Sequence, residues 1–378
     1  MNIAIVCYPT FGGSGVVATE LGRALAIMGH QIHFISYNSP VRLEALNDPN
    51  IHYHEVNVPD YPLFKYQPYE LALSSRLVDV VKTHKVDVLH VHYAIPHAYA
   101  AYMAKKMLLD NGIHIPIVTT LHGTDITLVG SHPFYRPAVT FSINHSDRVT
   151  AVSESLKQDT LRLFNINKKI EVIPNFIDID RIKAKGKPCE RSLLANKEEK
   201  IVTHISNFRP LKRILDVIAV FEGILPKVKS KLMMVGEGPE KNKAMEYVKN
   251  KSLQEYVLFL GNSNEIDKIL CFSDLFLLPS EKESFGLSAL EAMAHGVPVI
   301  SSNAGGIPEV NQHGVTGYLS NIGDTADMTQ NALRLLENEK QHNLFKIQAQ
   351  EQAQRFNINT IVSQYESSYV DAIASSQY

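Results

Sequence analysis

The first residues, MNIAIVCYPTFGGSGVVATELGRALAIMGHQIHFIS (1–36), contain the pattern that decides the fold. Residues 2–7 form a short apolar run rich in β-branched side chains, as in the buried strands of parallel sheets. Glycines follow, and apolar residues then recur at helical spacing from Val16 until Gly29 ends the helix. A second strand is expected at 31–36. The order strand, glycine turn, helix and strand predicts a Rossmann-like α/β unit.

The glycine turn itself is open to more than one interpretation. Gly13-x-Gly15-x-x-Ala18 has the spacing of a dinucleotide-binding fingerprint. NAD binding also requires an acidic residue at the end of the second strand, but residues 36–38 are Ser, Tyr and Asn. Because free N–H groups at the start of a helix attract anions, the sequence favours a different phosphate or carboxylate at this turn. A turn without any ligand is the alternative.

The length and the composition bound the class of protein. A chain of 378 residues with 45% hydrophobic residues is long enough for two domains with ordinary cores. The formal net charge of −2 gives no electrostatic support for nucleic-acid binding. No apolar run approaches the length of about 18 residues that a membrane-spanning helix needs, so we expect no membrane partner.

The cysteines and the amino terminus bear on location. Cys7, Cys189 and Cys271 are odd in number and form no C-x-x-C pair, a pattern typical of a reducing compartment without a disulfide framework. The chain opens on a strand pattern rather than on a charged and then apolar leader, so no signal peptide is expected. The sequence therefore favours the cytoplasm, and it leaves monomer and homo-oligomer both open.

Strand and helix patterns alternate along the chain, which indicates parallel sheets covered by helices on both faces. The first series of expected strands comprises 2–7, 31–36, 52–56, 86–91, 115–120, 148–152 and 171–173. The second series comprises 201–205, 231–235, 257–260, 275–279, 299–301 and 317–319. A charged stretch with Gly and Pro, KAKGKPCERSLLANKEEK (183–200), separates the two series.

This division predicts the domain organisation. We expect a Rossmann-like domain at 1–182, a second one at 183–358, and an amphipathic helix at 359–378 that packs back onto one of them. Ligands of such sheets bind outside the carboxyl ends of the strands. The two domains are therefore expected to face each other across a cleft lined by those ends.

The segment EKESFGLSALEAMAHGVPVISSNAGGIPEV (281–310) contains the most informative motif. Glu283 lies in the loop before an expected helix, and Glu291 lies about one turn inside it. The free N–H groups of 284–287 fall between them, at the positive end of the helix dipole. This arrangement suits a sugar nucleotide, with its diphosphate at the helix N-terminus and its ribose and hexose hydroxyls on the carboxylates. Two solvated surface glutamates are the alternative.

With these motifs, the chain resembles the retaining family-four glycosyltransferases, which have the GT-B fold. The resemblance is carried by ESFGLSALE (283–291) and GVPVISSNAGGIPE (296–309). The strings CYPTFGGSGVVATELG (7–22), LHVHYAIPHA (89–98) and TTLHGTDIT (119–127) are similar to the branch of the family that begins bacillithiol biosynthesis. That branch transfers N-acetylglucosamine from UDP-GlcNAc to L-malate. The resemblance thus implies a UDP-sugar-dependent retaining hexosyltransferase whose two partners are these small molecules.

The resemblance also implies roles for individual residues. Catalytic roles fall on His122, against the donor sugar, and on Glu283, which contacts a hydroxyl of that sugar. Glu291 matches the glutamate that binds the uridine ribose, and Lys212 matches the lysine on the diphosphate. Asn207 occupies the place of a family arginine, which leaves open whether Arg209 or Arg213 supplies the missing charge. The other expected donor-binding residues are Gly13, Ser14, Gly236, Asn262, Ser284, Phe285, Gly286 and Leu287.

The acceptor site is expected in the N-terminal half. A malate has two carboxylates and a hydroxyl, so hydrogen-bond donors and cations should hold it. The expected acceptor-binding residues are Ser14, Lys65, Tyr93, Thr120 and Arg148. No cofactor is expected, because a lysine, arginines and helix N-termini can neutralise the departing UDP without a metal.

Two patterns that could indicate metals are assigned other roles. Asp178-Ile179-Asp180 is a D-x-D pair, but it follows Pro174-Asn175-Phe176, where helix capping is the expected role. His90 and His92 alternate on one strand, yet no third ligand lies nearby in the sequence, and zinc takes at least three protein ligands. We expect no metal site from either pair.

Other functions are kept as alternatives. Within the transferases, another UDP-sugar donor or a lipid or glycan acceptor is the nearest one, although no basic amphipathic face is evident in the N-terminal half. Outside that class stand a sugar-nucleotide epimerase and a non-catalytic sugar-nucleotide sensor. The two glutamates and Lys212 together favour the transferase over both.

Overall fold

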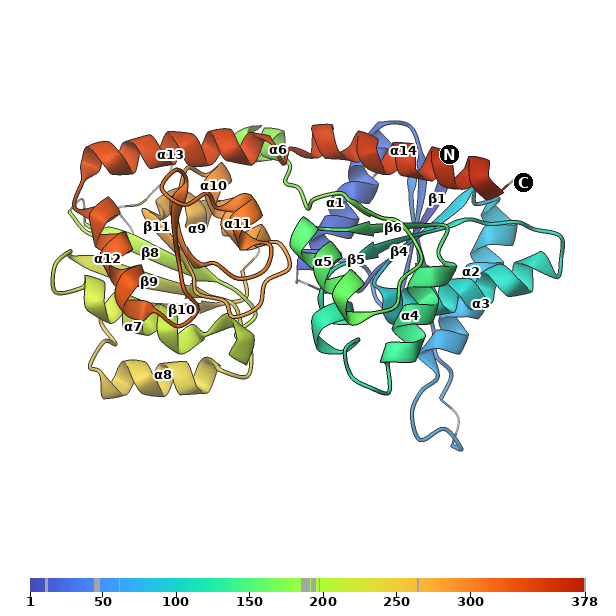
Figure 1. Cartoon of the computed structure of the whole chain (residues 1–378), viewed down its shortest axis with the longest axis horizontal. Helices are drawn as coiled ribbons and strands as arrows, with labels where there is room; N and C mark the ends of the chain where they lie inside the picture. The colour runs from blue at the N-terminus through green and yellow to red at the C-terminus, as the bar shows by residue number, and fades with distance from the viewer. Residues whose placement is uncertain are drawn as a thin grey trace. The chain divides into compact units, whose positions relative to one another are not determined.

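The computed structural model describes residues 1–378 except 11–12, 44–47, 61, 185–190, 192–194, 197, 264 and 377–378. The chain divides into two compact units. The first unit comprises Met1–Phe176 and Ile358–Tyr378, and the second comprises Ile177–Asn357. Each unit has a parallel sheet with helices around it (Figure 1). The two-domain α/β organisation is thus confirmed, with the division after Phe176 rather than after residue 182.

The sheet of the first unit has seven parallel strands in the order β3-β2-β1-β4-β5-β6-β7. Their bounds are β1 Asn2–Val6, β2 Gln31–Ser36, β3 Ile51–Glu55, β4 Val88–His92, β5 Ile117–Leu121, β6 Arg148–Ala151 and β7 Ile170–Val172. All residues of β4 and β5 are buried, as expected for central strands covered on both faces. The chain reverses direction across the sheet between β1 and β4, which is the switch point where such folds bind ligands.

Helices cover both faces of this sheet. They are α1 Gly13–Ile27, α2 Tyr69–His84, α3 Tyr99–Leu109, α4 Arg136–His145, α5 Glu154–Leu163 and α14 Ile358–Ser376, with short helical turns η1 Ala94–Ala98 and η2 Thr124–Leu128. The C-terminal helix α14 belongs to this unit (Figure 1). Its Tyr365 and Tyr369 are fully buried, and the Tyr369 hydroxyl is hydrogen-bonded to His90 Nδ1 of β4 at 2.8 Å. The expected final helix therefore completes the N-terminal unit.

The second unit has six parallel strands in the order β10-β9-β8-β11-β12-β13. Their bounds are β8 Lys200–Ile205, β9 Ser230–Val235, β10 Val257–Gly261, β11 Leu275–Leu278, β12 Val299–Ser302 and β13 Gly317–Ser320. The helices are α6 Ile179–Ala184, α7 Ile214–Ile224, α8 Lys241–Asn250, α9 Ile266–Phe272, α10 Leu287–Ala294, α11 Ile307–Val310, α12 Thr325–Leu336 and α13 Glu339–Gln354, with a turn η4 at Pro210–Lys212. Every expected strand of both series is present, with ends shifted by no more than two residues.

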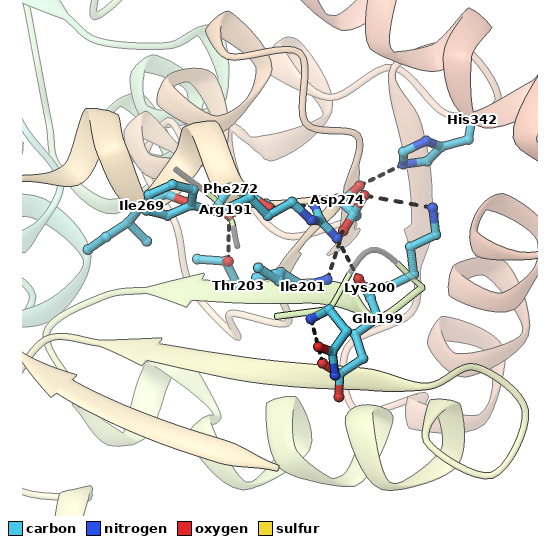
Figure 2. Close-up of polar contacts among 11 residues, drawn as sticks. Arg191, Glu199, Lys200, Ile201, Thr203, Ile269, Phe272, Asp274 and His342 are labelled. Atoms are coloured by element: carbon cyan, nitrogen blue, oxygen red, sulfur yellow. Dashed lines mark hydrogen bonds and ion pairs between the residues drawn. The ribbon is translucent and has the colours of Figure 1, made fainter. Parts of the chain in front are cut away.

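Aspartates that directly precede strands fasten the amino-terminal edge of each sheet. In the second unit, Asp274 Oδ2 accepts the N–H of Ile201 at 2.8 Å and pairs with Arg191 Nη2 at 2.7 Å (Figure 2). The Arg191 guanidinium also donates to the Phe272 carbonyl at 2.9 Å, and His342 Nε2 is hydrogen-bonded to the Asp274 carbonyl at 2.7 Å. This cluster joins β8, β11, α9 and α13 at one point.

The first unit uses the same arrangement twice. Asp87 accepts the N–H of Asn2 at 2.7 Å, and Asp147 accepts the N–H of Ile117 at 2.7 Å while pairing with Lys105 at 2.6 Å. The N–H groups of Asn2, Ile117 and Ile201 lie at the ends of their sheets, where backbone donors need an acceptor other than a neighbouring strand. A carboxylate acceptor at this position therefore satisfies a backbone donor and fixes where the strand begins.

Two further features bear on expectations from the sequence. Cys7 is a buried free thiol, but Cys271 is disulfide-bonded, so the expectation of a chain without disulfides was wrong at that residue. Cys189 lies outside the described residues. Within the described part of the chain, no helix combines the length and the apolarity needed to cross a membrane.

We predict that Asp274→Asn destabilises the second unit. The change removes the charge that Arg191 pairs with, and hydrogen bonds to charged groups contribute about 1.5–3 kcal/mol each. Guanidinium chloride unfolding should therefore show a loss of about 2 kcal/mol in the free energy of unfolding. Glu265→Gln is the matched control, because it breaks an exposed Lys268–Glu265 pair and should cost at most about 0.5 kcal/mol. Equal losses in the two variants would contradict the anchoring role of Asp274.

Candidate active site

The expected donor-binding residues of the second unit lie in loops that follow its strands. Because the strands are parallel, the loops after β8, β9, β11 and β12 meet at the carboxyl edge of one sheet. The loop after β8 contains Lys212, and the loop after β11 contains Glu283. The Glu281 N–H donates to the Leu211 carbonyl at 2.8 Å, which ties these two loops together.

An ion pair lies at the centre of this edge. Lys212 Nζ is 2.5 Å from Glu283 Oε2, and each side chain is 16% exposed. The pair is therefore shielded from bulk water but open to a ligand. A lysine in this position can turn from the carboxylate to an incoming phosphate, and the carboxylate is then free to accept a hydroxyl hydrogen. The structure thus brings together two of the residues to which the family resemblance gives roles.

The glycine pair after β12 supports the backbone of Glu283. A Cβ atom at Gly305 would lie 2.0 Å from the Glu283 carbonyl oxygen, and one at Gly306 would lie 2.3 Å from the Ser284 oxygen. Gly305 also has a φ of +53°, and the Gly306 N–H donates to the Glu283 carbonyl at 3.0 Å. Only glycine fits this close approach, which explains the two adjacent glycines of the motif.

A second glycine loop supports the other side of the ion pair. A Cβ atom at Gly236 would lie 1.8 Å from the Ser206 carbonyl oxygen, and one at Gly238 would lie 2.8 Å from the Phe208 backbone. Gly236 and Gly238 have φ values of +124° and +158°. The predicted donor-binding residue Gly236 therefore fixes the loop that leads to Lys212, and the structure gives it a packing role.

A buried histidine fastens the same loop. His204 Nδ1 donates to the Leu277 carbonyl at 2.8 Å, so its Nε2 can accept the Ser206 hydroxyl hydrogen at 2.8 Å. Burial lowers the pKa of His204 to about 4, which keeps the imidazole neutral for this role. Sequence reasoning missed His204, because nothing in the pattern of β8 distinguishes it from a packing residue.

The start of α10 presents the remaining groups of this loop that the sequence predicts to bind the donor. Gly286 precedes the helix with a φ of +95°, and Phe285 is buried against Phe356 with ring centroids 5.5 Å apart. These two residues fix the direction in which the N–H groups of 284–287 point. Glu291 lies in the second turn of α10, as the motif predicted.

The geometry favours one of the two arginines that could supply the charge missing at Asn207. Arg213 Nε pairs with Asp216 Oδ2 at 2.6 Å at the start of α7, so its charge is already engaged. Asn207 and Arg209 are both exposed in the loop after β8. Within the described part of the chain, the Arg209 side chain has no hydrogen bond or ion pair. Arg209 is therefore the better candidate for the missing charge, while Asn262 is exposed just beyond β10.

A second polar cluster lies at the carboxyl edge of the sheet in the first unit. The Tyr93 hydroxyl, after β4, donates to Ser14 Oγ in the first turn of α1 at 2.7 Å. The Tyr93 ring packs against those of Tyr8 and His122, with centroids 5.3 Å and 5.1 Å apart. A Cβ atom at Gly15 would lie 2.5 Å from the Thr10 carbonyl oxygen. This close approach places the start of α1 beside the cluster. Gly13 is the first residue of α1.

His122 is held in this cluster by a second histidine and by an aspartate. His122 Nε2 is hydrogen-bonded to His92 Nδ1 at 2.7 Å. Asp125 accepts the N–H groups of Gly123 at 2.9 Å and Ala94 at 2.8 Å, which fixes the loop around His122. Burial lowers the pKa of His122 to about 3 and holds the pKa of His92 well below its usual value, so both imidazoles are neutral. Burial raises the pKa of Asp125 to about 6.

Three predicted acceptor residues are not brought to this cluster. Arg148 begins β6 and therefore lies at the amino edge, where it pairs with Asp371 at 3.4 Å and Glu171 at 3.8 Å. The Thr120 hydroxyl is fully buried and bonded to Thr150 Oγ1 at 2.7 Å and His90 Nε2 at 2.8 Å. Lys65 is exposed in the loop before α2. Their acceptor roles gain no support from the geometry.

The two doubtful metal patterns have structural roles. Asp178 Oδ1 accepts the Arg181 N–H at 2.9 Å at the start of α6, which is the expected capping contact. His90 and His92 are hydrogen-bonded to Thr120, Tyr369 and His122. Among the residues that the structure describes, neither pair belongs to a group of three or more metal-ligating side chains.

Comparison with known proteins gives a consistent result. The model Glycosyltransferase Family 4 matches residues 11–181, and Glycosyl transferases group 1 matches residues 189–352. The chain is 49% identical to N-acetyl-alpha-D-glucosaminyl L-malate synthase of Bacillus anthracis, over 99% of this chain and 97% of that protein. It is 23% identical to the phosphatidylinositol N-acetylglucosaminyltransferase GPI3 subunit of Saccharomyces cerevisiae, over 89% of this chain and 75% of that protein.

Solved structures confirm the fold class. The chain matches Anabaena Alr3699/HepE in complex with UDP and glucose with a TM-score of 0.80 at 20% identity, covering 97% of this chain and 99% of that one. It matches the apo form of the lipopolysaccharide outer core galactosyltransferase WaaB with a TM-score of 0.71 at 18% identity, covering 98% and 99% of the two chains. Two parallel-sheet Rossmann-like units of the GT-B class are therefore confirmed.

We predict that Gly305→Ala disrupts the Glu283 loop. A methyl group there meets the Glu283 carbonyl and is also strained by a positive φ, for a combined cost of roughly 3 kcal/mol. Gly314→Ala is the matched control, because Gly314 also has a positive φ of +76° but nothing within 4 Å of its Cβ position. The control should cost about 1–2 kcal/mol, as measured by denaturant unfolding. If both variants lost the same stability, the close packing of the glycine pair would not matter.

Because of its buried histidines, we predict that the first unit becomes less stable as the pH falls. Their folded pKa lies below the unfolded value of about 6.5, so the unfolded chain binds more protons and stability falls as the pH drops from 6.5 towards 3. For His122 the loss is about 1.4 kcal/mol per pH unit, or about 2 kcal/mol at pH 5. His122→Gln should therefore lose less stability between pH 7 and pH 5 than the exposed control His114→Gln. The measurement is urea unfolding at both pH values, and identical losses in the two variants would refute the assignment.

Proposed function

This chain belongs to the glycosyltransferase family of N-acetyl-alpha-D-glucosaminyl L-malate synthase, and we propose that it transfers N-acetylglucosamine from UDP-GlcNAc to the hydroxyl of L-malate. The products are GlcNAc-α-malate and UDP, which makes this the first step of bacillithiol synthesis. The full-length similarity to the Bacillus anthracis enzyme is the observation that carries the proposal. We assign the activity to the cytoplasm.

The donor is assigned to the carboxyl edge of the second unit. The UDP diphosphate draws Lys212 away from Glu283, since a doubly charged phosphate group is a stronger partner than one carboxylate. The N–H groups at the start of α10 add the positive end of the helix dipole, and Arg209 adds a further charge. Glu283 then accepts a hydrogen bond from a hexose hydroxyl, and Glu291 accepts hydrogen bonds from the ribose. These groups stabilise the leaving UDP without a metal.

The acceptor is assigned to the cluster around Ser14 and Tyr93. The Ser14 hydroxyl and the free N–H groups of the first turn of α1 are donors for a malate carboxylate. Neutral His122 offers either a donor or an acceptor to the sugar, depending on its tautomer. The other carboxylate of malate has no assigned cation, and Lys65 and Arg148 are not supported as its partners.

Transfer with retention follows from positioning and charge stabilisation. The bond between the anomeric carbon and the phosphate oxygen breaks, and the bond to the malate hydroxyl oxygen forms on the same face of the sugar. The malate proton passes to the departing phosphate oxygen, so no protein base is required. The protein contributes by holding the reactants in contact and by stabilising the charge on UDP, which together lower the barrier.

The proposal predicts strict use of L-malate. If the site recognises both carboxylates of malate, an acceptor that lacks one carboxylate leaves buried donors without partners. Each unpaired donor weakens binding by about 1–3 kcal/mol. UDP release should therefore be fastest with L-malate and at least tenfold slower with D-malate, lactate or glycerol 3-phosphate at matched concentration. Turnover should persist in excess EDTA, and NMR of the product should show an α linkage.

Variants separate the acceptor site from the donor site in the same assay. Ser14→Ala should raise the KM for malate more than the KM for UDP-GlcNAc, whereas the exposed control Ser75→Ala should change neither. Lactate or glycerol 3-phosphate acting as well as L-malate would reject the acceptor assignment and leave another acceptor within the same family. A β-linked product would reject the retaining mechanism.

A further inference from the structure

Four histidines that play no part in the proposed transfer gather on one face of the sheet in the first unit. His33 lies on β2, His52 and His54 lie on β3, and His84 is the last residue of α2. His33 and His52 are register partners, so these two and His54 point to the same face of the sheet. The end of α2 brings His84 against them, with its ring 4.6 Å from that of His33.

Three of these side chains already have the spacing of a ligand set. One nitrogen each of His33, His54 and His84 lies within 4.8 Å of the other two. His33 Nδ1 is hydrogen-bonded to His54 Nε2 at 3.0 Å, so one proton lies between two nitrogen lone pairs. In a tetrahedral Zn²⁺ site each ligand nitrogen lies 2.0–2.1 Å from the metal, so two ligand nitrogens are about 3.3 Å apart. Small side-chain rotations therefore suffice to bring the three histidine nitrogens to these distances.

Two imidazoles of the cluster, those of His33 and His54, are neutral at neutral pH. Burial, and then the neighbouring imidazoles, lower the pKa of His33 to about 3 and that of His54 to about 4. Neutral imidazoles have the free lone pairs that a metal requires. The Arg76 guanidinium, which acts on His54, is paired with Asp79 at 2.6 Å, and this pairing reduces its repulsion of a cation.

The fourth histidine orients the group. His52 Nε2 donates to Gln31 Oε1 at 3.1 Å, because the amide nitrogen of Gln31 is itself used as a donor to Asn50 Oδ1. The His52 ring stacks on His33 with centroids 4.9 Å apart. This stacking limits rotation of His33, in the way that neighbouring groups commonly fix metal-ligating histidines.

We propose that His33, His54 and His84 form a binding site for a divalent transition metal of the zinc class. Three imidazole nitrogens suit Zn²⁺, with a water molecule in the fourth position. The metal takes the place of the proton shared by His33 and His54, and the neutral imidazole that carried this proton then carries it on its other ring nitrogen. The site lies on the sheet face beneath α2, not in the loops of the carboxyl edge. Its role is to clamp the end of α2 to β2 and β3.

The test uses the full-length, untagged chain after EDTA treatment and removal of the chelator. Zn²⁺ binding at pH 7.5, measured by competition with a chromophoric chelator, should give one tight site per chain. Co²⁺ should give the intense visible absorption bands of a tetrahedral site. His84→Gln and His54→Gln should each weaken Zn²⁺ binding at least tenfold, whereas the exposed control His114→Gln should bind like the wild type.

A thermal measurement distinguishes a clamp from adventitious binding. Saturating Zn²⁺ should raise the Tm of the wild type by about 5 °C and that of His84→Gln by about 1 °C or less. Both half-buried positions, 54 and 84, are tested because substitution of buried His33 could prevent folding. The proposal is overturned if the chain has no tight site, or if the His54 and His84 variants bind Zn²⁺ as tightly as the wild type.

Discussion

All strands in both sheets run parallel to their neighbours, and this constraint assigns different tasks to the two edges of each sheet. Inside the sheet the backbone groups pair with each other, so unpaired polar groups concentrate where strands begin and end. At the amino edges, Asp87, Asp147 and Asp274 each accept an N–H from the first or second residue of a neighbouring strand and fix where that strand begins. At the carboxyl edges the loops present side chains and helix N-termini instead, and there the ligand-binding chemistry gathers.

At the carboxyl edge of the second unit, the candidate site depends on how closely its loops pack. Lys212 and Glu283 come from loops that follow different strands, and their 2.5 Å contact depends on how closely those loops approach. Gly236, Gly238, Gly305 and Gly306 allow that approach, since a Cβ at any of them would meet backbone atoms at 2.8 Å or less. These glycines therefore act through packing, and the ligand contacts of the proposed function fall to the charged residues.

Much of this organisation could be predicted from the sequence, because it depends on local patterns. Apolar runs located every strand, and the spacing of Glu283 and Glu291 placed one before α10 and one within it. What failed depended on the third dimension. Arg148 is the first residue of β6, whereas Tyr93 follows the last residue of β4, so the two lie at opposite edges of the sheet. Their positions in the sequence do not show this. The cluster of His33, His54 and His84 needs the register of β2 with β3 and the end of α2, and no local pattern contains either.

The placement of α14 has a consequence for how the chain folds during synthesis. The N-terminal unit contains Met1–Phe176 but also needs Ile358–Tyr378, whose Tyr365 and Tyr369 are buried in its core. The second unit is continuous from Ile177 to Asn357 and is entirely translated before α14. The second unit can therefore complete its core first, while the N-terminal unit keeps an uncovered apolar face until α14 leaves the ribosome. The part of the chain that is made first is the last to finish folding.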